Sequence, residues 1–258
     1  MMESYTVKPV AKALQVLEYV AGEGRELTLT EICWKVCQPK TTVFRYLQTL
    51  CQTGLLAHDP ASDRYRAGVR LWALGQMAGR RSALCEVALP VMKRLRDRFN
   101  ETVNLAEIDA DEIVYIEMVE SRRSLRMQAK VGARDPAYCT AVGKAMLAFV
   151  APERREEHLP TRLAARTPAT VTSRRALREQ LARARALGFA WERGENEEGA
   201  CCVGAPVFEL SGRVIAGLSV SAPEGRMSAP LERQIAQALL GATGEISGKL
   251  SARPDPAG

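Results

Sequence analysis

The stretch LTLTEICWKVCQPKTTVFRYLQTLCQTGLL, residues 27–56, decides the fold of the first part of the chain. A candidate helix N-cap, Thr30 or Thr28, precedes a short segment with apolar residues at helical spacing. Pro39 then disfavours a helical conformation for the residue before it. The segment after Pro39 is again helical in period and closes at Gly54. We therefore expect two helices joined by a tight turn.

The second of these helices has two chemically different faces. Val43, Leu47 and Leu50, spaced four and three apart, predict a buried stripe. The other side carries hydroxyl, amide and guanidinium groups, from Thr41, Thr42, Arg45, Gln48 and Thr49. Two helices joined by a short turn, the second with such a face, form a helix-turn-helix.

This polar face suits DNA. The sequence Lys40-Thr41-Thr42 at the start of the helix offers backbone N–H groups, the positive end of the helix dipole and two hydroxyls to a phosphate. Arg45, one turn further, can contact a guanine edge with two hydrogen bonds. No acidic residue occurs from Ile32 through His58, and this favours an anionic partner over a helix face that is merely solvated.

The flanking segments predict a winged arrangement. Upstream, one apolar face of an amphipathic helix is predicted by Val10, Leu14, Leu17 and Ala21. Downstream, LLAHDPASDRYRAG alternates and turns at residues 59–62, which predicts a two-stranded wing. Arg64 and Arg66 of this wing could contact the DNA backbone beside the helix.

Three cysteines in this region raise an alternative function. Cys33 and Cys37 are four residues apart on one helix, and Cys51 follows Leu47 by the same spacing. Buried free cysteine behaves as a small hydrophobe, so we expect all three to pack between the two helices. The alternative is a metal- or redox-responsive regulator that uses these three thiols; a zinc site would need a fourth ligand, for which His58 is the only nearby candidate.

Composition bounds the remaining possibilities. The chain has 258 residues, a net charge of +6 and seven scattered cysteines without a Cys-x-x-Cys pair, which indicates one large or two ordinary domains in a reducing compartment. No stretch approaches the roughly 18 to 20 apolar residues that span a bilayer, and the N-terminus lacks a signal peptide pattern. We expect a cytoplasmic protein without membrane association. With only His58 and His158 available as histidines, we expect neither an enzyme nor a cofactor or metal.

Beyond Asn100 the apolar period changes to that of strands. TVNLAEI and EIVYIEMV flank a turn at residues 109–111, and residues 125–131 alternate strictly, with Leu125 and Val131 facing inward. Helices are expected at 140–150, 173–188 and about 228–250; Pro90 should divide an earlier helical stretch, and the tail SARPDPAG should be disordered. Hairpins covered by helices predict an α+β domain with a largely antiparallel sheet.

The last two expected strands, ACCVGAPVF and RVIAGLSVSA, predict a hollow on one sheet face. If the loop 209–212 sets Phe208 opposite Arg213, Cys202 lies opposite Ser219. The face then carries small side chains and two hydroxyls, from Cys202, Gly204, Gly217, Ser219 and Ser221. This composition fits a small-ligand pocket; the alternative is that the small residues pack under a helix. The nearby Glu195, Glu197 and Glu198 are expected in a solvated turn; the alternative is that this acidic loop binds a cation.

Both parts of the chain resemble the IclR family of bacterial transcriptional regulators. The register of its winged helix-turn-helix holds from about Val10 to Gly75, and VGARDPAYCTAVGKAMLA, LGFAWERGENEEGACCVGAPVF and GRVIAGLSVSAP extend the resemblance to about residue 250. It implies a DNA-binding domain at 8–75, a linker at 76–84 and a GAF-like effector-binding domain at 85–252. The DNA-binding positions would be Lys40, Thr41, Thr42, Arg45, Tyr46, Arg64 and Arg66. Gln38 and Thr41 depart from the family pattern near the DNA side.

The resemblance also implies an effector site. Family positions that help to hold the effector match Ala141, Val142, Glu192, Cys202, Ser219 and Ser221. Family effectors are often small organic or aromatic acids, which Glu192 would repel unless it is protonated or faces a hydroxyl. The expected function is a ligand-responsive repressor or activator that binds an inverted repeat in double-stranded DNA as a homodimer or homotetramer.

Overall fold

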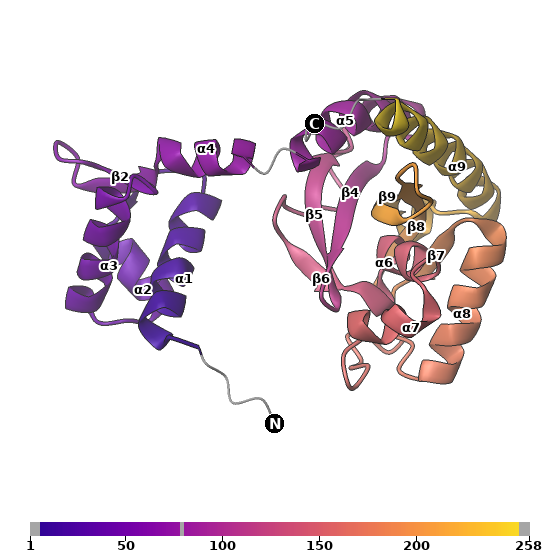
Figure 1. Ribbon diagram of the computed structural model, residues 1–258, viewed down its shortest axis with the longest axis horizontal. Helices are drawn as coiled ribbons and strands as arrows, with labels where there is room; N and C mark the ends of the chain where they lie inside the picture. The colour runs from indigo at the N-terminus through magenta and orange to yellow at the C-terminus, as the bar shows by residue number, and fades with distance from the viewer. Residues whose placement is uncertain (1–5, 78–79, 253–258) are drawn as a thin grey trace. The chain divides into compact units, whose positions relative to one another are not determined.

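The structure is a computed structural model that describes residues 6–77 and 80–252. The chain divides into two compact units, Met1–Gly79 and Arg80–Gly258 (Figure 1). The expected linker at 76–84 covers this boundary, although residues 78–79 lie outside the described residues, as do residues 253–258 of the expected disordered tail. Among the helices of the described ranges, none is long and apolar enough to cross a membrane.

The smaller unit is a winged helix-turn-helix. Its elements are α1 (Lys8–Gly22), β1 (Leu27–Thr28), α2 (Leu29–Val36), α3 (Lys40–Gln52), β2 (Leu56–Asp59), β3 (Arg64–Ala67) and α4 (Val69–Met77). The three strands form an antiparallel sheet in the order β1-β3-β2, so the predicted wing gains a third strand. Val43, Leu47 and Leu50 of α3 are buried as predicted, and they pack with Ile32 and Tyr65 in one core.

Local sequence explains how the two central helices begin and end. Thr28, and not Thr30, caps α2: its hydroxyl accepts the N–H of Glu31, whose carboxylate accepts the N–H of Thr28 at 2.7 Å. Cys37 ends α2 in the left-handed conformation, at a φ of 50°. Pro39 then lies directly before α3, where its missing N–H leaves no helical hydrogen bond unmade.

The buried face of α1 differs from the predicted one. Leu17 is buried, but its buried neighbours are Val16 and Val20, whereas Val10 and Leu14 are 55% and 49% exposed. The core contacts reach only the second half of α1. The apolar residues of its first half are therefore exposed in the single chain.

The larger unit is an α+β domain with a six-stranded antiparallel sheet. Its elements are α5 (Arg80–Phe99), β4 (Thr102–Asp109), β5 (Glu112–Val119), β6 (Arg134–Pro136), α6 (Ala141–Leu147), α7 (Pro152–Arg155), α8 (Arg174–Leu187), β7 (Ala190–Arg193), β8 (Ala200–Phe208), β9 (Val214–Pro223) and α9 (Ala229–Ser251). Short 3-10 turns lie at Ala137–Cys139, Glu156–His158 and Glu224–Arg226. The strand order is β6-β5-β4-β9-β8-β7, which confirms the predicted sheet type.

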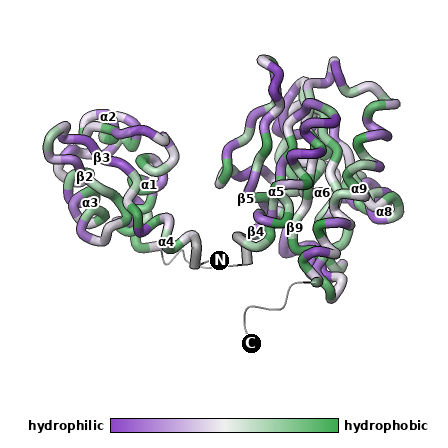
Figure 2. The backbone as a smooth tube through the Cα atoms, turned by 90° about the horizontal axis from the view of Figure 1, so that it is seen from above, coloured by the Kyte–Doolittle hydropathy of each residue, from purple (hydrophilic) through white to green (hydrophobic). Residues whose placement is uncertain are grey.

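The two faces of this sheet are covered differently. One face packs against α5 and α9 over a continuous apolar core that contains Leu105, Val203 and Leu218. The other face lies under α6, with α8 packed behind α6 (Figure 1). Figure 2 shows hydrophobic segments concentrated in the central strands of this unit. The second face carries the small and polar residues of β8 and β9, so the layer that α6 covers contains the candidate site.

Two expected features of this unit were wrong. The helix α5 continues through Pro90, because Val87, Val91 and their buried neighbours hold both halves against the sheet and offset the lost hydrogen bond. Residues 125–131 form no strand, and Leu125 and Val131 are 71% and 60% exposed. The edge of the sheet beside β5 is occupied by β6 instead.

The β8–β9 register also differs from the predicted one. Cys202 pairs with Ser221 and Gly204 pairs with Ser219, two residues away from the expected partners. The turn accounts for one residue of the shift, since Phe208 lies opposite Val214 and not Arg213, and an irregularity between Val207 and Phe208 adds the second, since Val207 pairs with Ala216. Because side chains alternate with a period of two, a two-residue shift leaves the same side chains on the same face.

Candidate DNA-binding surface and ligand cavity

The surface of α3 carries the predicted DNA-binding residues on its outer side. Lys40, Thr41 and Arg45 are exposed, and Thr42 and Tyr46 are half-buried. Phe44, which the sequence analysis did not select, is also 45% exposed. Within the part of the chain that the structure describes, no carboxylate pairs with Arg45. The outer face of α3 therefore presents a cation, hydroxyls and an aromatic ring to whatever binds there.

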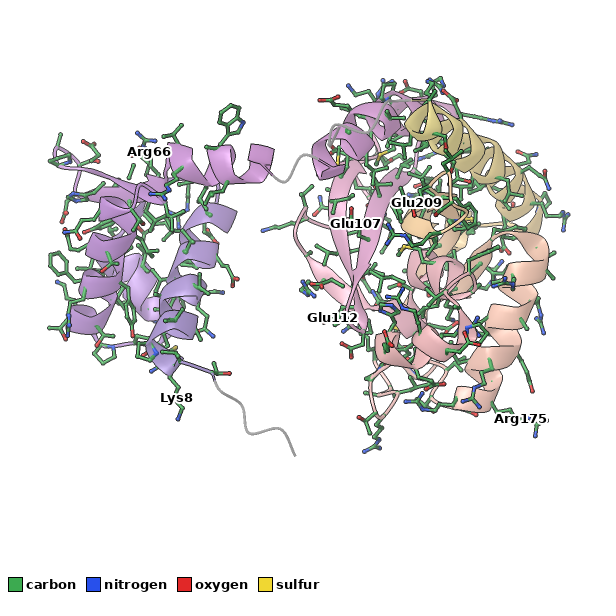
Figure 3. All side chains as sticks on the ribbon, in the orientation of Figure 1. Lys8, Arg66, Glu107, Glu112, Arg175 and Glu209 are labelled. Carbon is green, nitrogen blue, oxygen red and sulfur yellow. The ribbon has the colours of Figure 1, made fainter. Side chains whose placement is uncertain are left out.

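The two arginines of the wing already have partners within the unit. Arg64 donates to the backbone carbonyl of Glu26 at 3.3 Å, and Arg66 lies 3.7 Å from the carboxylate of the same residue. Arg66 is on the surface of the smaller unit in Figure 3. Arg64 and Arg66 remain partly exposed, so both guanidiniums can leave Glu26 for a phosphate, to which charge-assisted hydrogen bonds are stronger. Gln38, at the turn before α3, accepts a hydrogen bond from Lys12 of α1 at 2.8 Å.

The three cysteines of this unit do not share one environment. Cys33 and Cys51 are half-buried and pack against the core as predicted, and burial raises the pKa of both thiols. Cys37 is exposed, so the prediction that it packs between the helices was wrong; its left-handed backbone turns it out of the helix. Across residues 6–77 and 80–252 no group of three or more His, Cys, Asp and Glu residues could hold a metal ion.

A cavity of about 330 Å³ opens in the larger unit between the sheet and the segment that leads to β6. The six residues singled out by the family resemblance all line it: Ala141, Val142, Glu192, Cys202, Ser219 and Ser221. The rest of its wall includes Thr102, Asn104, Tyr115, Met127, Asp135 and Arg166. Its volume is within the range of small-molecule sites in proteins.

The two glycines of the predicted hollow serve a different purpose. A Cβ at Gly204 would lie 2.7 Å from the backbone nitrogen of Val142, and a Cβ at Gly217 would lie 2.6 Å from the Val142 side chain. These glycines let α6 approach the sheet closely. They pack under a helix, as the alternative interpretation held, while Cys202, Ser219 and Ser221 line the cavity.

Glu192 brings a carboxyl group into the cavity from β7. It is 2% exposed, and it accepts the backbone N–H of Glu195 at 2.8 Å. Burial raises the pKa of Glu192 above its ordinary value, against the opposing effect of hydrogen bonds from the Cys202 thiol and that N–H. A carboxyl with a raised pKa is more readily protonated, and in that form it can donate a hydrogen bond without repelling an anion.

The loop that follows Glu192 is not wholly solvated. Glu197 and Glu198 are exposed as predicted, but Glu195 is buried and forms an ion pair with Lys144 of α6, whose side chain is 1% exposed. The prediction for Glu195 was therefore wrong. The carboxylate is buried because Lys144 supplies its counter-charge, and the Thr170 hydroxyl, which donates to the Glu195 carbonyl at 2.6 Å, also holds the loop in place.

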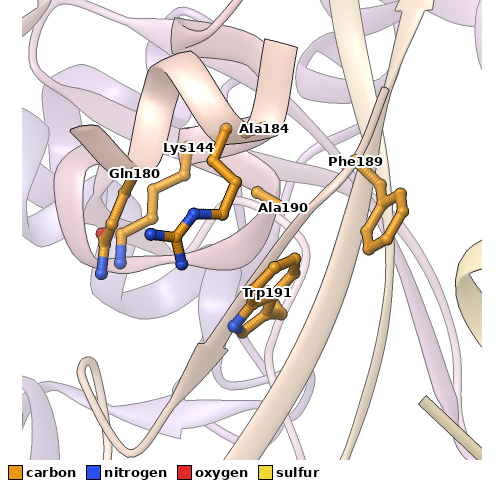
Figure 4. A pocket seen from close by; sticks show the side chains of 7 residues that line it. Lys144, Gln180, Ala184, Phe189, Ala190 and Trp191 are labelled. Atoms are coloured by element: carbon orange, nitrogen blue, oxygen red, sulfur yellow. The ribbon is translucent and has the colours of Figure 1, made fainter. Parts of the chain in front are cut away.

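A second, smaller cavity lies beside this ion pair. Its volume is about 50 Å³, and its wall contains Lys144, Gln180, Arg183, Ala184, Phe189, Ala190 and Trp191. Figure 4 shows the ends of Lys144 and Gln180 side by side, with Trp191 across from them. Small-molecule sites have volumes of about 300 Å³ or more, so this cavity is too small for a typical organic ligand.

Sequence reasoning missed the contribution of β4 to the larger cavity. Asn104 and Thr102 reach it from the middle of the sheet, and both are buried. The signal was present as two polar residues at alternate positions of TVNLAEI, on the face opposite Val103 and Leu105. These two residues could be assigned to the cavity only if the pairing of β4 with β9 were known.

Comparisons with known proteins agree for both units. The family model described as the IclR helix-turn-helix domain matches residues 9–60, and the one described as the bacterial transcriptional regulator IclR C-terminal matches residues 76–248. The HTH-type transcriptional regulator KdgR of Escherichia coli (strain K12) is 37% identical over 224 residues, covering 86% of this chain and 85% of KdgR. The regulator BhcR of Paracoccus denitrificans is 32% identical over 254 residues, covering 98% of this chain and 91% of BhcR.

Two solved structures are similar over nearly the whole chain. The Thermotoga maritima IclR has a TM-score of 0.78 and 30% identity, and the alignment covers 95% of this chain and 100% of that protein. An IclR homologue from Microbacterium hydrocarbonoxydans, complexed with 4-hydroxybenzoate, has a TM-score of 0.80 and 29% identity, with 95% and 100% covered.

Proposed function

The chain belongs to the IclR family of bacterial transcriptional regulators. From that premise we propose which function each of its two units has. The protein is a ligand-responsive, DNA-binding transcriptional regulator. We assign operator binding to residues 8–75, a linker to 76–84 and effector binding to 85–252. It acts in the cytoplasm, where its operator lies, and regulates without catalysing a reaction of its own.

Operator recognition is assigned to the outer face of α3 and to the wing. Lys40, Thr41, Thr42, Arg45 and Tyr46 bind from the helix, and Arg64 and Arg66 bind from the wing. Arg45 is the principal base reader, because it is exposed one turn inside α3 and no carboxylate of the described residues holds it. The wing arginines contact phosphates, a role for which they must leave Glu26.

A second copy of the chain is the assigned partner of the smaller unit. Val10 and Leu14 of α1 are 55% and 49% exposed, and Val69 and Trp72 of α4 are 79% and 67% exposed. Apolar stripes at helical spacing on two helices are typical of an interface. A two-fold dimer, alone or within a tetramer, would place two α3 helices on successive major grooves of an inverted repeat. Leu14→Glu should lower the mass measured by light scattering, whereas Leu210→Glu, on the exposed β8–β9 turn, should leave it unchanged.

The effector is a small organic or aromatic acid with one carboxylate. Three acidic side chains (Asp135, Glu192, Glu197) and two arginines (Arg134, Arg166) line the cavity. Arg134 is held by two carboxylates, those of Asp109 and Glu112, at 2.6 Å each. Arg166 is paired with Asp135 alone, at 3.4 Å, so Arg166 is the more available cation. If Glu192 is protonated, the other charged side chains of the wall are two carboxylates and two arginines, so the wall carries no net charge to repel a single negative charge on the ligand. The similar protein that was crystallised with 4-hydroxybenzoate supports this class of ligand.

The observation that carries this proposal is that all six expected effector positions line one cavity in the unit that follows the DNA-binding domain. The test needs a DNA site and a ligand. The DNA site is selected from random double-stranded DNA by its binding to the purified protein. The ligand is an acid found in a thermal-shift screen, since a ligand that binds only the folded state raises the melting temperature. Arg45→Ala should weaken binding to the selected site by about 10-fold or more and leave the acid-induced shift intact.

Ser219→Leu should give the opposite result, because the larger side chain fills the cavity while α3 is unchanged. The variant should bind the selected DNA normally and should neither shift its melting temperature with the acid nor release DNA in response to it. A normal response in Ser219→Leu removes the cavity from the assignment, and unchanged DNA affinity in Arg45→Ala removes α3. The two failures are independent.

A further inference from the structure

Phe44 is an exposed aromatic side chain on the face of α3 that we assign to DNA. It is 45% exposed, and among the described residues of the smaller unit it lies outside the core that contains Val43 and Leu47. Phe44 follows Thr41 by three residues and precedes Gln48 by four, and side chains at these spacings are neighbours on a helix surface. An apolar ring is therefore present within a strip of hydrogen-bonding side chains.

The position of Phe44, and not its exposure, points to a base as its partner. Single apolar side chains are common on protein surfaces, but Phe44 lies beside Arg45, the principal base reader. It is also separate from the exposed apolar residues of α1 and α4 that we assign to contacts between copies of the chain.

The chemistry of the ring limits what it can contact in the major groove. A phenyl group has neither a donor nor an acceptor, so it cannot pair with the nitrogen and oxygen atoms on the base edges. The C5 methyl of thymine is the one methyl group that the four base pairs present there, and phenylalanine is among the side chains that contact it. Phe44 therefore fits a thymine and none of the other three bases.

We propose that Phe44 packs against the C5 methyl group of a thymine in each half-site of the operator and thereby specifies thymine at that position. Arg45 and Phe44 then read different groups, a guanine edge by hydrogen bonds and a thymine methyl by apolar contact. Burial of one methyl-sized group corresponds to about a fourfold change in affinity. This inference rests on the proposed binding of α3 to the operator.

The test replaces single thymines of the selected DNA site by deoxyuridine. Uracil pairs with adenine as thymine does and lacks only the C5 methyl, so the protein and the hydrogen bonds of the base pair are unchanged. The affinity of the full chain for each DNA is measured by fluorescence anisotropy. In the wild type, replacement of at least one thymine in each half-site should weaken binding about fourfold. In Phe44→Ala the same replacement should change the affinity less than about twofold, because the contact with the methyl is already lost.

Trp34→Ala is the matched control for the loss of an exposed aromatic side chain. Trp34 belongs to the same unit, lies on α2 and is 84% exposed. The control should keep the fourfold dependence on the methyl. Phe44→Gln is the second variant in case Phe44→Ala does not fold, since glutamine is a good helix former and places an amide where the ring was. It should bind thymine and uracil alike.

The outcomes separate this inference from the proposed function. A selected site without thymine in its half-sites overturns the inference alone, and so does a site in which no replacement weakens binding by about twofold or more. The same holds for a dependence that survives in a folded Phe44 variant or that Trp34→Ala abolishes. Failure to select any DNA site, or unchanged affinity in Arg45→Ala, overturns both operator binding by α3 and this inference.

Discussion

Arg45 of the smaller unit and Glu192 of the larger unit are both charged side chains at candidate sites, and their surroundings are opposite. Arg45 is exposed on a helix whose other face forms the core. Glu192 is 2% exposed, and burial raises its pKa. A surface site can change its side chains with little effect on folding, whereas a cavity site is built from the packing that stabilises the domain. Substitutions and pH should therefore affect the two units in different ways.

The largest effect is expected from Gly204→Ala in the larger unit. The added Cβ would lie 2.7 Å from the backbone nitrogen of Val142 and 2.8 Å from the carbonyl carbon of Ala141, and backbone atoms cannot move aside without displacing α6. We expect a loss of about 1–3 kcal/mol in the free energy of unfolding and a weaker response to the effector. Calorimetry, with hydrogen exchange to assign the transition to this unit, measures the loss.

The matched control for this substitution is Gly241→Ala. A Cβ at Gly241, in the middle of α9, would meet nothing within 4 Å, and alanine is the better helix former. The control should be neutral or slightly stabilising. If both variants melt alike, close packing of α6 on the sheet does not stabilise the cavity.

A pH effect of intermediate size is expected from Cys139, which lies before α6 and is fully buried. Burial raises the pKa of its thiol from 9.0 to about 12. Its contribution to stability is complete below pH 9 and is lost as the pH rises toward 12, at roughly 1.4 kcal/mol for each pH unit. In Cys139→Ala the stability of the larger unit should fall less steeply between pH 9 and 11. The exposed Cys37→Ala should keep the wild-type slope, and equal slopes in all three proteins would contradict the assignment.

Burial was predicted correctly from the sequence where a helix has a single apolar face and that face packs against the same chain. The stripe of Val43, Leu47 and Leu50 is buried because α3 has a single core to face. Val10 and Leu14 have the same helical spacing and are exposed, since periodicity identifies an apolar face and does not say whether the same chain or another copy covers it. The cavity face of β8 and β9 was predicted despite a register error of two residues, because an even shift preserves the face.

The rest of the cavity depends on contacts that are distant in sequence. Asn104 reaches it because β4 pairs with β9, and this strand order leaves no local signal. Glu195 is buried because Lys144, on a different element, supplies its counter-charge. A solvated turn and a buried ion pair have the same local sequence, and only the fold distinguishes them.

A smaller effect is expected at the start of α2. The Thr28 hydroxyl accepts the N–H of Glu31, and Thr28→Ala removes this cap at a cost of about 1 kcal/mol to the smaller unit. Thr30→Ala is the matched control, because Thr30 is exposed inside the helix and does not cap it. Hydrogen exchange of peptides from residues 27–36 should increase in the first variant only. A larger increase in Thr30→Ala would restore Thr30 as the N-cap.

The smallest effect is expected on the stability of the smaller unit at low pH, through Glu31. The effect of Cys139, by contrast, is expected at high pH. Hydrogen bonds from the Thr28 backbone N–H and then from Arg25 lower the pKa of Glu31 to about 2. A lowered pKa means that this contribution is present above the ordinary value of 4.5 and is lost as the pH falls toward 2. Glu31→Gln keeps an acceptor for the capping box and cannot titrate, so the melting temperature of the smaller unit should change less between pH 4.5 and 2 than in the wild type. The control is Glu18→Gln, at an exposed position of α1; its melting temperature should change with pH as in the wild type. If Glu31→Gln loses stability in acid as steeply as the wild type, the smaller unit is not held by this surface carboxylate, and the contrast with the buried groups of the larger unit fails.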